Sequence, residues 1–285
     1  MPDAEPSATD ALQSDPGQSD PGQSDPVLAL LWRDRHSPPP VRRGPKQKVT
    51  IDEVVATGIA MADADGLAAL SMRGVAQRLS IGAMSLYTYV PGRDELVVLM
   101  VDEVLQQTRR PPHGPDLRTR LRAVAESAYD ECNAHPWLLE VDGLRAWLGP
   151  GAAERYEWQL AAVDGIGLSD VDMDQAVTLL LGIASTAARA VHVVRAAERR
   201  SGQTELEWWE ANAEALGEAM AGRDFPLADR VGSAAGEEYQ AASDPDRQFR
   251  FAIDVAIDGL MAHRVECCNI RDRALSAVDW EERRT

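Results

Sequence analysis

The sequence predicts an all-α protein, with an N-terminal three-helix unit that contains a helix-turn-helix and a larger helical domain after it. Three observations predict this class. Apolar residues recur every three or four positions from Thr50 onward, which is the period of an amphipathic helix. The capping pattern Thr-x-x-Glu precedes two of these runs, at Thr50–Glu53 and Thr204–Glu207. No alternation of apolar and polar residues is long enough to predict a sheet.

The N-terminal region, residues 1–44, is expected to be a tail that ends in a basic arm. Residues 14–23 repeat the unit Ser-Asp-Pro-Gly-Gln, which offers nothing to bury and predicts disorder. The apolar run Val27–Trp32 is interpreted as a helical turn that rests on a neighbouring element. A docking element for a partner and a misassigned translation start remain the alternatives.

The predicted three-helix unit and its continuation span residues 45–110. Thr50 caps a first helix that ends near Gly66, and Ser71 caps a second, short helix. A third short helix follows Gly82 and ends near Val90. A fourth begins at Arg93.

The second domain is predicted over residues 115–270, with a tail at 271–285. Its helices are expected at roughly 116–134, 151–165, 172–200, 204–221 and 244–267. These ranges follow from the apolar period and from start signals such as Ser243 before Asp244 and Pro245.

Composition and charge exclude several classes of protein. A chain of 285 residues with 45% hydrophobic and 26% charged residues is typical of soluble globular proteins. The longest charge-free apolar run, Gln175 to Ala188, has 14 residues, fewer than the roughly 20 of a membrane helix. The acidic first thirty residues predict no secretory signal. Three cysteines, Cys132, Cys267 and Cys268, cannot form a disulfide framework, so we expect a reduced, cytoplasmic protein without a membrane partner.

The net charge of −17 argues against a protein that coats nucleic acid without selection. Residues 42–110, however, hold 9 basic and 8 acidic side chains, a net of about +1, whereas the rest holds 20 and 38, a net of −18. The acidity therefore lies outside one nearly neutral segment. Its entrance is a basic arm suited to DNA phosphates or a minor groove, formed by Arg42, Arg43, Lys46 and Lys48.

The spacing of residues 71–90 indicates a helix-turn-helix, whose second helix enters the major groove of DNA. Ile81, Leu86 and Val90 can seat that helix on its neighbours. The remaining positions are then expected to face outward, where they can reach phosphates or base edges: Ala83, Met84, Ser85, Tyr87, Thr88 and Tyr89. Arg93 can hold a phosphate at the start of the fourth helix. A helical hairpin of an enzyme is the alternative interpretation of the spacing alone.

The run Thr50–Met100 closely resembles the DNA-binding domain of the tetracycline-repressor (TetR) family. The resemblance rests on the stretches Ser71–Ala76 and Met84–Leu96, which carry an alanine-containing second helix, a Leu-Tyr pair and a basic residue before the fourth helix. The family's usual turn glycine is Ser80 here, and its usual lysine is Arg93. The resemblance implies DNA contacts by Arg73, Ala83, Met84, Ser85, Tyr87, Tyr89 and Arg93.

The same resemblance implies that the C-terminal domain dimerises and holds a small effector. Residues 246–260 are similar to the family's closing dimer helix, and the small residues of the 172–200 helix allow close helix approach. Two such helices from each subunit would form a four-helix interface. The alternative is that both helices fill the core of one subunit.

Candidate effector-binding residues are Tyr129, His135, Trp147, Ser185 and His192. Trp147-Leu148-Gly149 stands where tetracycline-binding relatives have a histidine that ligates a magnesium–drug complex. Because indole cannot ligate a metal, we expect no metal and no other cofactor. No other spacing of His, Cys or carboxylates predicts a metal site.

Together these features predict a homodimeric regulator of transcription, with no catalytic motif. A small apolar or amphipathic effector is expected to release it from a palindromic operator. The alternative is a DNA-binding module without an effector, governed by a protein partner that docks on Val27–Trp32.

Overall fold

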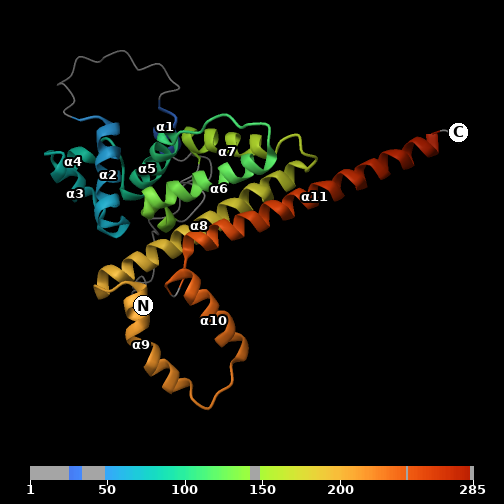
Figure 1. Cartoon of the computed structure of the whole chain (residues 1–285). Coiled ribbons are helices and arrows are strands. Elements are labelled where there is room, and N and C mark those ends of the chain that lie inside the picture. Colours follow the sequence, from blue (N-terminus) through green and yellow to red (C-terminus); the bar gives the residue numbers. More distant parts are fainter. Residues whose placement is uncertain (1–25, 34–48, 142–147, 242, 283–285) are drawn as a thin grey trace, which may run out of the picture.

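The computed structural model describes residues 26–33, 49–141, 148–241 and 243–282, with side chains up to residue 263. Within these ranges every regular element is a helix, so the all-α prediction is confirmed. Figure 1 shows the N-terminal helices, in blue and teal, at one end of the molecule, and the two longest helices of the C-terminal half running side by side.

The N-terminal unit contains α1 (Pro26–Leu31), α2 (Ile51–Asp65), a 3-10 turn (Leu67–Ala69), α3 (Met72–Arg78), α4 (Ala83–Leu86) and α5 (Arg93–Gln107). Thr50 and Glu53 form the predicted capping box at the start of α2. Ser71 accepts from the Gly74 amide and caps α3. The predicted helix starts in this unit are therefore confirmed.

The short helix α1 packs on α5 instead of standing free. Its Val27 and Leu31 are each 3% exposed, and Leu31 belongs to the N-terminal core. The indole of Trp32 donates to the Leu148 carbonyl at 3.1 Å. The interpretation of Val27–Trp32 as a helical turn on a neighbour is therefore confirmed.

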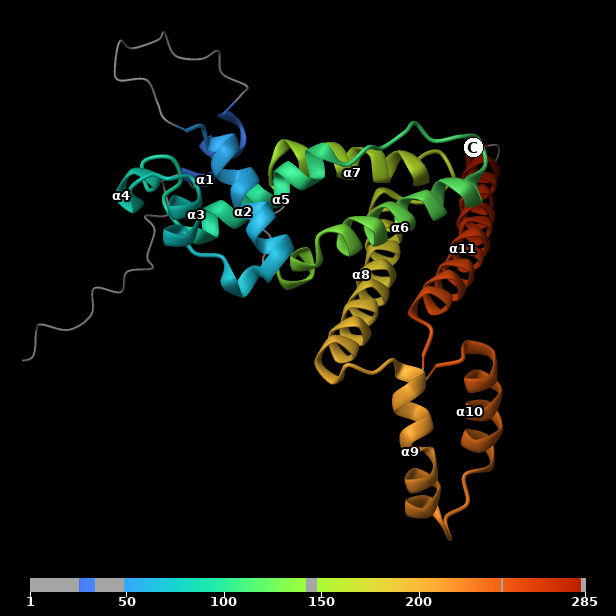
Figure 2. The same ribbon diagram turned by 60° about the vertical axis from the view of Figure 1, so that its left-hand side comes forward.

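The second domain contains α6 (Leu117–Ala134), the 3-10 helix η3 (Pro136–Glu140), α7 (Pro150–Val163), α8 (Asp170–Ser201), α9 (Glu205–Met220), α10 (Pro226–Tyr239) and α11 (Pro245–Glu282). Five of these match predicted helices. The helix α10 was not predicted, and the last helix was predicted to end at residue 267, whereas α11 continues to Glu282. Figure 2 shows α9 and α10 projecting away from the remaining helices.

Two hydrophobic cores hold the molecule together. The first core contains residues of α2, α3, α4 and α5, together with Trp137 and Leu138 of η3 and Ala152 of α7. The second lies between α6, α7, α8 and α11, and includes Leu121, Leu180 and Ile253. Because η3 and α7 contribute to the first core, the N-terminal unit is anchored to the second domain by buried apolar contacts.

A buried carboxylate fixes α7 against α5. Asp102 on α5 is 2% exposed, and it accepts from the Ala152 amide at 3.1 Å and from Gln106 at 2.8 Å. Burial is the main cause that raises the pKa of this carboxyl group. A Cβ atom at Gly149 would lie 2.1 Å from an Asp102 oxygen, so the close approach requires glycine at that position.

The helix α8 is long and apolar enough to cross a membrane by length and composition alone. It lies instead between α6, α7 and α11, and Val177, Leu180 and Ala184 are buried in the second core. The central helix of an all-helical domain meets the same criteria, because it has apolar neighbours on several sides.

Candidate DNA interface and effector cavity

The turn between α3 and α4 sets the angle of the helix-turn-helix. The Ile81 amide donates to the Ala76 carbonyl at 3.0 Å, and the Ser80 amide donates to Gln77 at 3.1 Å. These two bonds form a Schellman motif, in which the residue after the helix takes a left-handed conformation. Ser80 occupies that position with φ of 56°. The turn therefore keeps its geometry although serine replaces the usual glycine.

The outer face of α4 is open to solvent. Met84 is 81% exposed and Tyr87 is 46% exposed, and Ser85 and Thr88 are exposed as well. Leu86 and Val90 are fully buried beneath them, as the sequence predicts. This arrangement presents polar and methyl groups outward on a helix that is fixed from below.

Two positions that were expected to face outward are only half-buried. Ala83, the first residue of α4, and Tyr89 pack against the first core. Tyr89 lies beyond the regular helix, which ends at Leu86 and not near Val90 as predicted, so Tyr89 does not share the exposed face of Met84 and Tyr87. Arg73 on α3 is exposed, and it forms no ion pair with any acidic group of the described residues. The basic arm formed by Arg42, Arg43, Lys46 and Lys48 lies outside the described residues.

Arg93 has a structural role that the sequence analysis did not anticipate. Its Nε donates to the Leu70 carbonyl at 3.1 Å, and its Nη2 donates to the Leu67 carbonyl at 2.8 Å. Its Nη1 lies 3.7 Å from Asp94. The guanidinium therefore ties α5 to the segment between α2 and α3, and only part of it faces solvent.

A cavity of about 740 Å³ lies in the second domain, between α6, η3, α7 and α8. Its apolar lining includes Ala128, Leu138, Leu139, Val141, Ala152 and Leu181. Its polar lining consists of Glu131, Cys132, Arg155, Tyr156, Gln159, Thr178, Ser185 and Arg189. This mixture of an apolar wall with a few convergent polar groups is typical of small-molecule sites.

Of the five predicted effector residues, the structure places only Ser185 in this cavity. Tyr129 instead stacks on Phe249 with 4.3 Å between ring centroids. Burial and a hydrogen bond to Asp246 raise the pKa of Tyr129 to about 12. Trp147 lies outside the described residues.

The two predicted histidines also lie outside this cavity. His135 contacts Asp63, with 2.8 Å between Nδ1 and Oδ1, and lines a separate cavity of about 390 Å³. His192 lies 3.2 Å from the Cys132 carbonyl, and burial lowers the pKa of this histidine. Both rings are held by protein groups.

Polar residues of α7 and α8 form the side of the cavity that the sequence analysis missed. Arg155 and Gln159 are one turn apart on α7, and Ser185 and Arg189 are one turn apart on α8. Gln159 is only 3% exposed. These residues could have been predicted from the sequence, because each helix carries two polar residues four positions apart on a face that is otherwise apolar.

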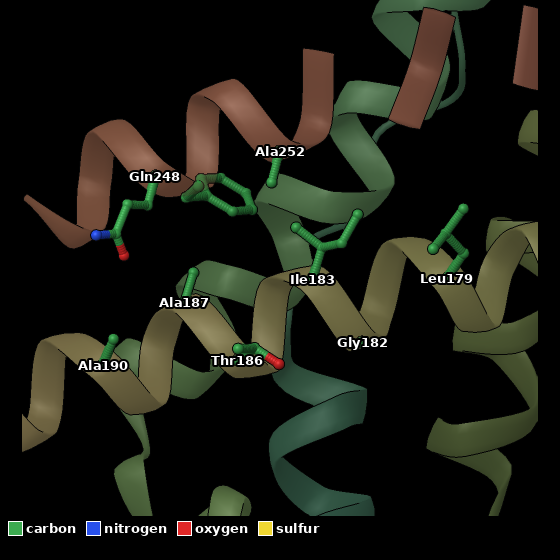
Figure 3. A pocket seen from close by; sticks show the side chains of 9 residues that line it. Leu179, Gly182, Ile183, Thr186, Ala187, Ala190, Gln248 and Ala252 are labelled. Atoms are coloured by element: carbon green, nitrogen blue, oxygen red, sulfur yellow. The ribbon is translucent and has the colours of Figure 1, made fainter. Parts of the chain in front are cut away.

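A second, shallower hollow lies on the outer face of α8 and α11, with a volume of about 450 Å³ (Figure 3). Its lining is almost entirely apolar and includes Leu179, Ile183, Ala187, Ala190, Phe249 and Ala252. Nearby on the same two helices, Phe251 is 71% exposed, Val193 is 62% exposed and Val255 is 55% exposed. These exposed apolar side chains do not contribute to the core of their own chain, and an exposed apolar patch of this kind is typical of a protein–protein contact.

Comparison with known proteins identifies the family of this chain. Residues 110–264 match the family described as "Tetracyclin repressor-like, C-terminal domain". The chain is also similar to the HTH-type transcriptional repressor DrrR1 of Streptomyces coeruleorubidus, with 37% identity over 236 residues, or 82% of this chain and 84% of the relative.

The chain belongs to the TetR family. Among solved TetR-family structures, apo ActR from Streptomyces coelicolor matches with a TM-score of 0.61 and 27% identity, covering 77% of this chain and 98% of that one. ActR in complex with actinorhodin, from the same organism, matches with a TM-score of 0.58 and 28% identity, covering 75% and 96%. The family assignment accounts for a helix-turn-helix followed by a larger helical domain.

Proposed function

We propose that this chain is a homodimeric TetR-family repressor that reads a palindromic operator and leaves it when a small molecule binds. The exposed face of α4 carries the proposal. Met84, Ser85 and Tyr87 stand outward on the second helix of a helix-turn-helix, the helix that enters the major groove in this motif. Arg73 and the basic arm would add phosphate contacts. We assign the chain no catalytic step, and we place it in the cytoplasm, where a bacterial-type operator is accessible.

The surface of α8 and α11 supports the dimer. Arg118 and Arg122 of α6 pair with Asp258 and Asp254 on one side of α11, which leaves Phe251 and Val255 on another side exposed. A second copy of the same surface would bury these side chains in a four-helix arrangement. A two-fold axis there would relate the two α4 helices, as a palindromic operator requires.

The 740 Å³ cavity supports an effector, because it has the volume and lining of a ligand site. It is bounded by η3, which also belongs to the N-terminal core through Trp137. A ligand that fits one arrangement of η3 better than another would shift the position of the DNA-binding unit. A difference of a few kcal/mol between the two states is sufficient for release.

The direct test is a gel-shift titration with the intergenic DNA upstream of the protein's own gene. We expect a specific complex whose affinity falls steeply with salt. Tyr87→Ala should weaken this complex by about 1–3 kcal/mol. Tyr239→Ala, a tyrosine of α10 distant from α4, is the matched control and should bind as the wild type does. Equal affinity for the wild type and Tyr87→Ala would contradict the assignment of α4 as the reading helix.

A DNA-binding module controlled by a protein partner is the second candidate. Docking of a partner on Val27–Trp32 is unfavourable, because Val27 and Leu31 are already buried against α5. The two candidates differ in one measurement. Small molecules should change the tryptophan fluorescence and release the operator if the cavity binds an effector, whereas neither signal should change under control by a partner.

A further inference from the structure

The charged groups that line the 740 Å³ cavity are not balanced. Among the described residues they are one carboxylate, Glu131, and two guanidinium groups, Arg155 and Arg189. Burial raises the pKa of the Cys132 thiol to about 11, so this thiol is neutral at pH 7. Hydrogen bonding to Asp174 is the main cause that raises the pKa of Tyr156, so its hydroxyl is neutral as well. In the described lining of the cavity, positive charge therefore exceeds negative charge.

Two buried arginines pair with the carboxylate of Glu131. One Glu131 oxygen lies 2.9 Å from Nη2 of Arg110, and the other lies 2.9 Å from Nη2 of Arg155. The Glu131 side chain is 3% exposed, and those of Arg110 and Arg155 are 9% and 13% exposed. Each Glu131 oxygen is thus paired with an arginine other than Arg189.

Arg189 stands at the cavity without an acidic partner among the described residues. Its Nη2 donates to the Leu139 carbonyl at 2.7 Å, and the side chain is otherwise exposed. Arg155 and Arg189 line the same cavity as Cys132. Two cations therefore approach the same wall of the cavity, beside apolar residues of η3 and α8.

We propose that the effector of this cavity is an amphipathic organic acid whose anionic group binds Arg189 and whose apolar body fills the space beside Leu138 and Leu181. This inference rests on the proposed function and specifies its ligand class. A guanidinium binds a carboxylate through charge-assisted hydrogen bonds, which can be bidentate. Cationic ligands would meet two arginines at this site, and inorganic phosphate would leave the apolar wall uncovered.

The position of Arg189 also connects binding to η3. The Leu139 carbonyl that it holds lies in η3, two residues from Trp137, which is buried in the N-terminal core. An acid that takes Nη2 of Arg189 competes with this carbonyl. Binding of the acid would then loosen η3 next to the DNA-binding unit.

The test uses the full chain and a matched pair of probes, anthracene-2-carboxylate and its neutral amide, with inorganic phosphate as a third arm. Dissociation constants come from quenching of tryptophan fluorescence at pH 7. We expect the acid to bind at least tenfold more tightly than the amide, and phosphate to show no saturable binding. In Arg189→Met, which keeps much of the length without the charge, the preference for the acid should disappear while the amide affinity stays unchanged. Arg195→Met, an exposed arginine of the same helix outside the cavity lining, is the control and should keep the preference.

Several outcomes would overturn the inference: equal or tighter binding of the amide, binding of neither organic probe, saturable binding of phosphate alone, or a preference that persists in Arg189→Met. A parallel gel shift separates this inference from the proposed function. A neutral probe that binds and releases the operator would leave the proposed repressor intact and reject the acidic ligand class. An acid that binds through Arg189 without releasing DNA would support the ligand class and count against effector-controlled repression.

Discussion

Asp63, near the end of α2, accepts a hydrogen bond through Oδ1 from the indole Nε1 of Trp137 at 2.8 Å. The same oxygen lies 2.8 Å from Nδ1 of His135. Because Trp137 is only 1% exposed, its indole N–H depends on this carboxylate for a partner. Asp63 thereby attaches α2 to η3. The two residues of η3 that follow Trp137, Leu138 and Leu139, line the cavity.

Replacing Asp63 tests the strength of this attachment. Asp63→Ala should lower the free energy of unfolding by about 1–3 kcal/mol, because it leaves the buried indole N–H of Trp137 unpaired. The control is Asp65→Ala, since Asp65 is exposed and lies 3.7 Å from Arg78. That surface pair should contribute less than about 1 kcal/mol. Urea unfolding followed by circular dichroism compares the two variants, and equal losses would argue against the special role of Asp63.

Arg93 stabilises the fold, in addition to its proposed role in DNA binding. In Arg93→Ala the carbonyls of Leu67 and Leu70 lose their donor, so stability should fall by about 1–2 kcal/mol. Arg93→Lys keeps the positive charge but cannot reproduce both hydrogen bonds. We expect the lysine variant to lose stability in urea yet to retain most of its operator affinity in a gel shift. If the alanine variant proved as stable as the wild type, the hydrogen bonds from Arg93 to Leu67 and Leu70 would not contribute to stability.

The left-handed turn at Ser80 should cost stability. A left-handed conformation disfavours a residue with a Cβ atom by about 1–2 kcal/mol, whereas glycine adopts it freely at some entropic cost. Ser80→Gly should therefore raise stability by about 0.5–1 kcal/mol, seen as a higher melting temperature. Ser85→Gly places glycine in the right-handed helix α4 and should lower stability by a similar amount. A destabilised Ser80→Gly protein would show that the serine makes a compensating interaction.

The sequence predicted those elements whose signals are local. Thr50, Ser71 and Thr204 cap helices where their side chains bond amides three residues on, and such caps are readable without knowledge of the fold. Leu86 and Val90 were predicted to be buried because a helix-turn-helix needs apolar residues that seat its second helix on the neighbouring helices. The helix α10 was missed because its N-cap residue, Phe225, makes no side-chain capping bond, and because Gly232 and Gly236 lie inside it.

The cavity could be predicted far less well, because its members come from distant parts of the chain. Glu131 and Arg155 are paired across two helices, and Arg189 meets Leu139 fifty positions earlier. Tyr129 and His135 have residue types common in binding sites, but the fold gives them other partners, Asp246 and Asp63. Tertiary pairing of this kind leaves no trace at a fixed spacing in the sequence.

The apolar surface of α8 and α11 predicts the state of assembly. Phe251 is 71% exposed on α11, and a second copy of the chain would bury it in the proposed four-helix interface. Phe251→Glu would place a charge in that interface on each subunit, which is costly when the charge is unpaired. Sedimentation equilibrium should therefore give twice the chain mass of 31.0 kDa for the wild type and a monomer for Phe251→Glu. Met84→Glu alters a side chain that is 81% exposed on α4, so this variant should stay dimeric while losing the operator. A dimer that survives Phe251→Glu at micromolar concentration would place the subunit contact elsewhere on the molecule.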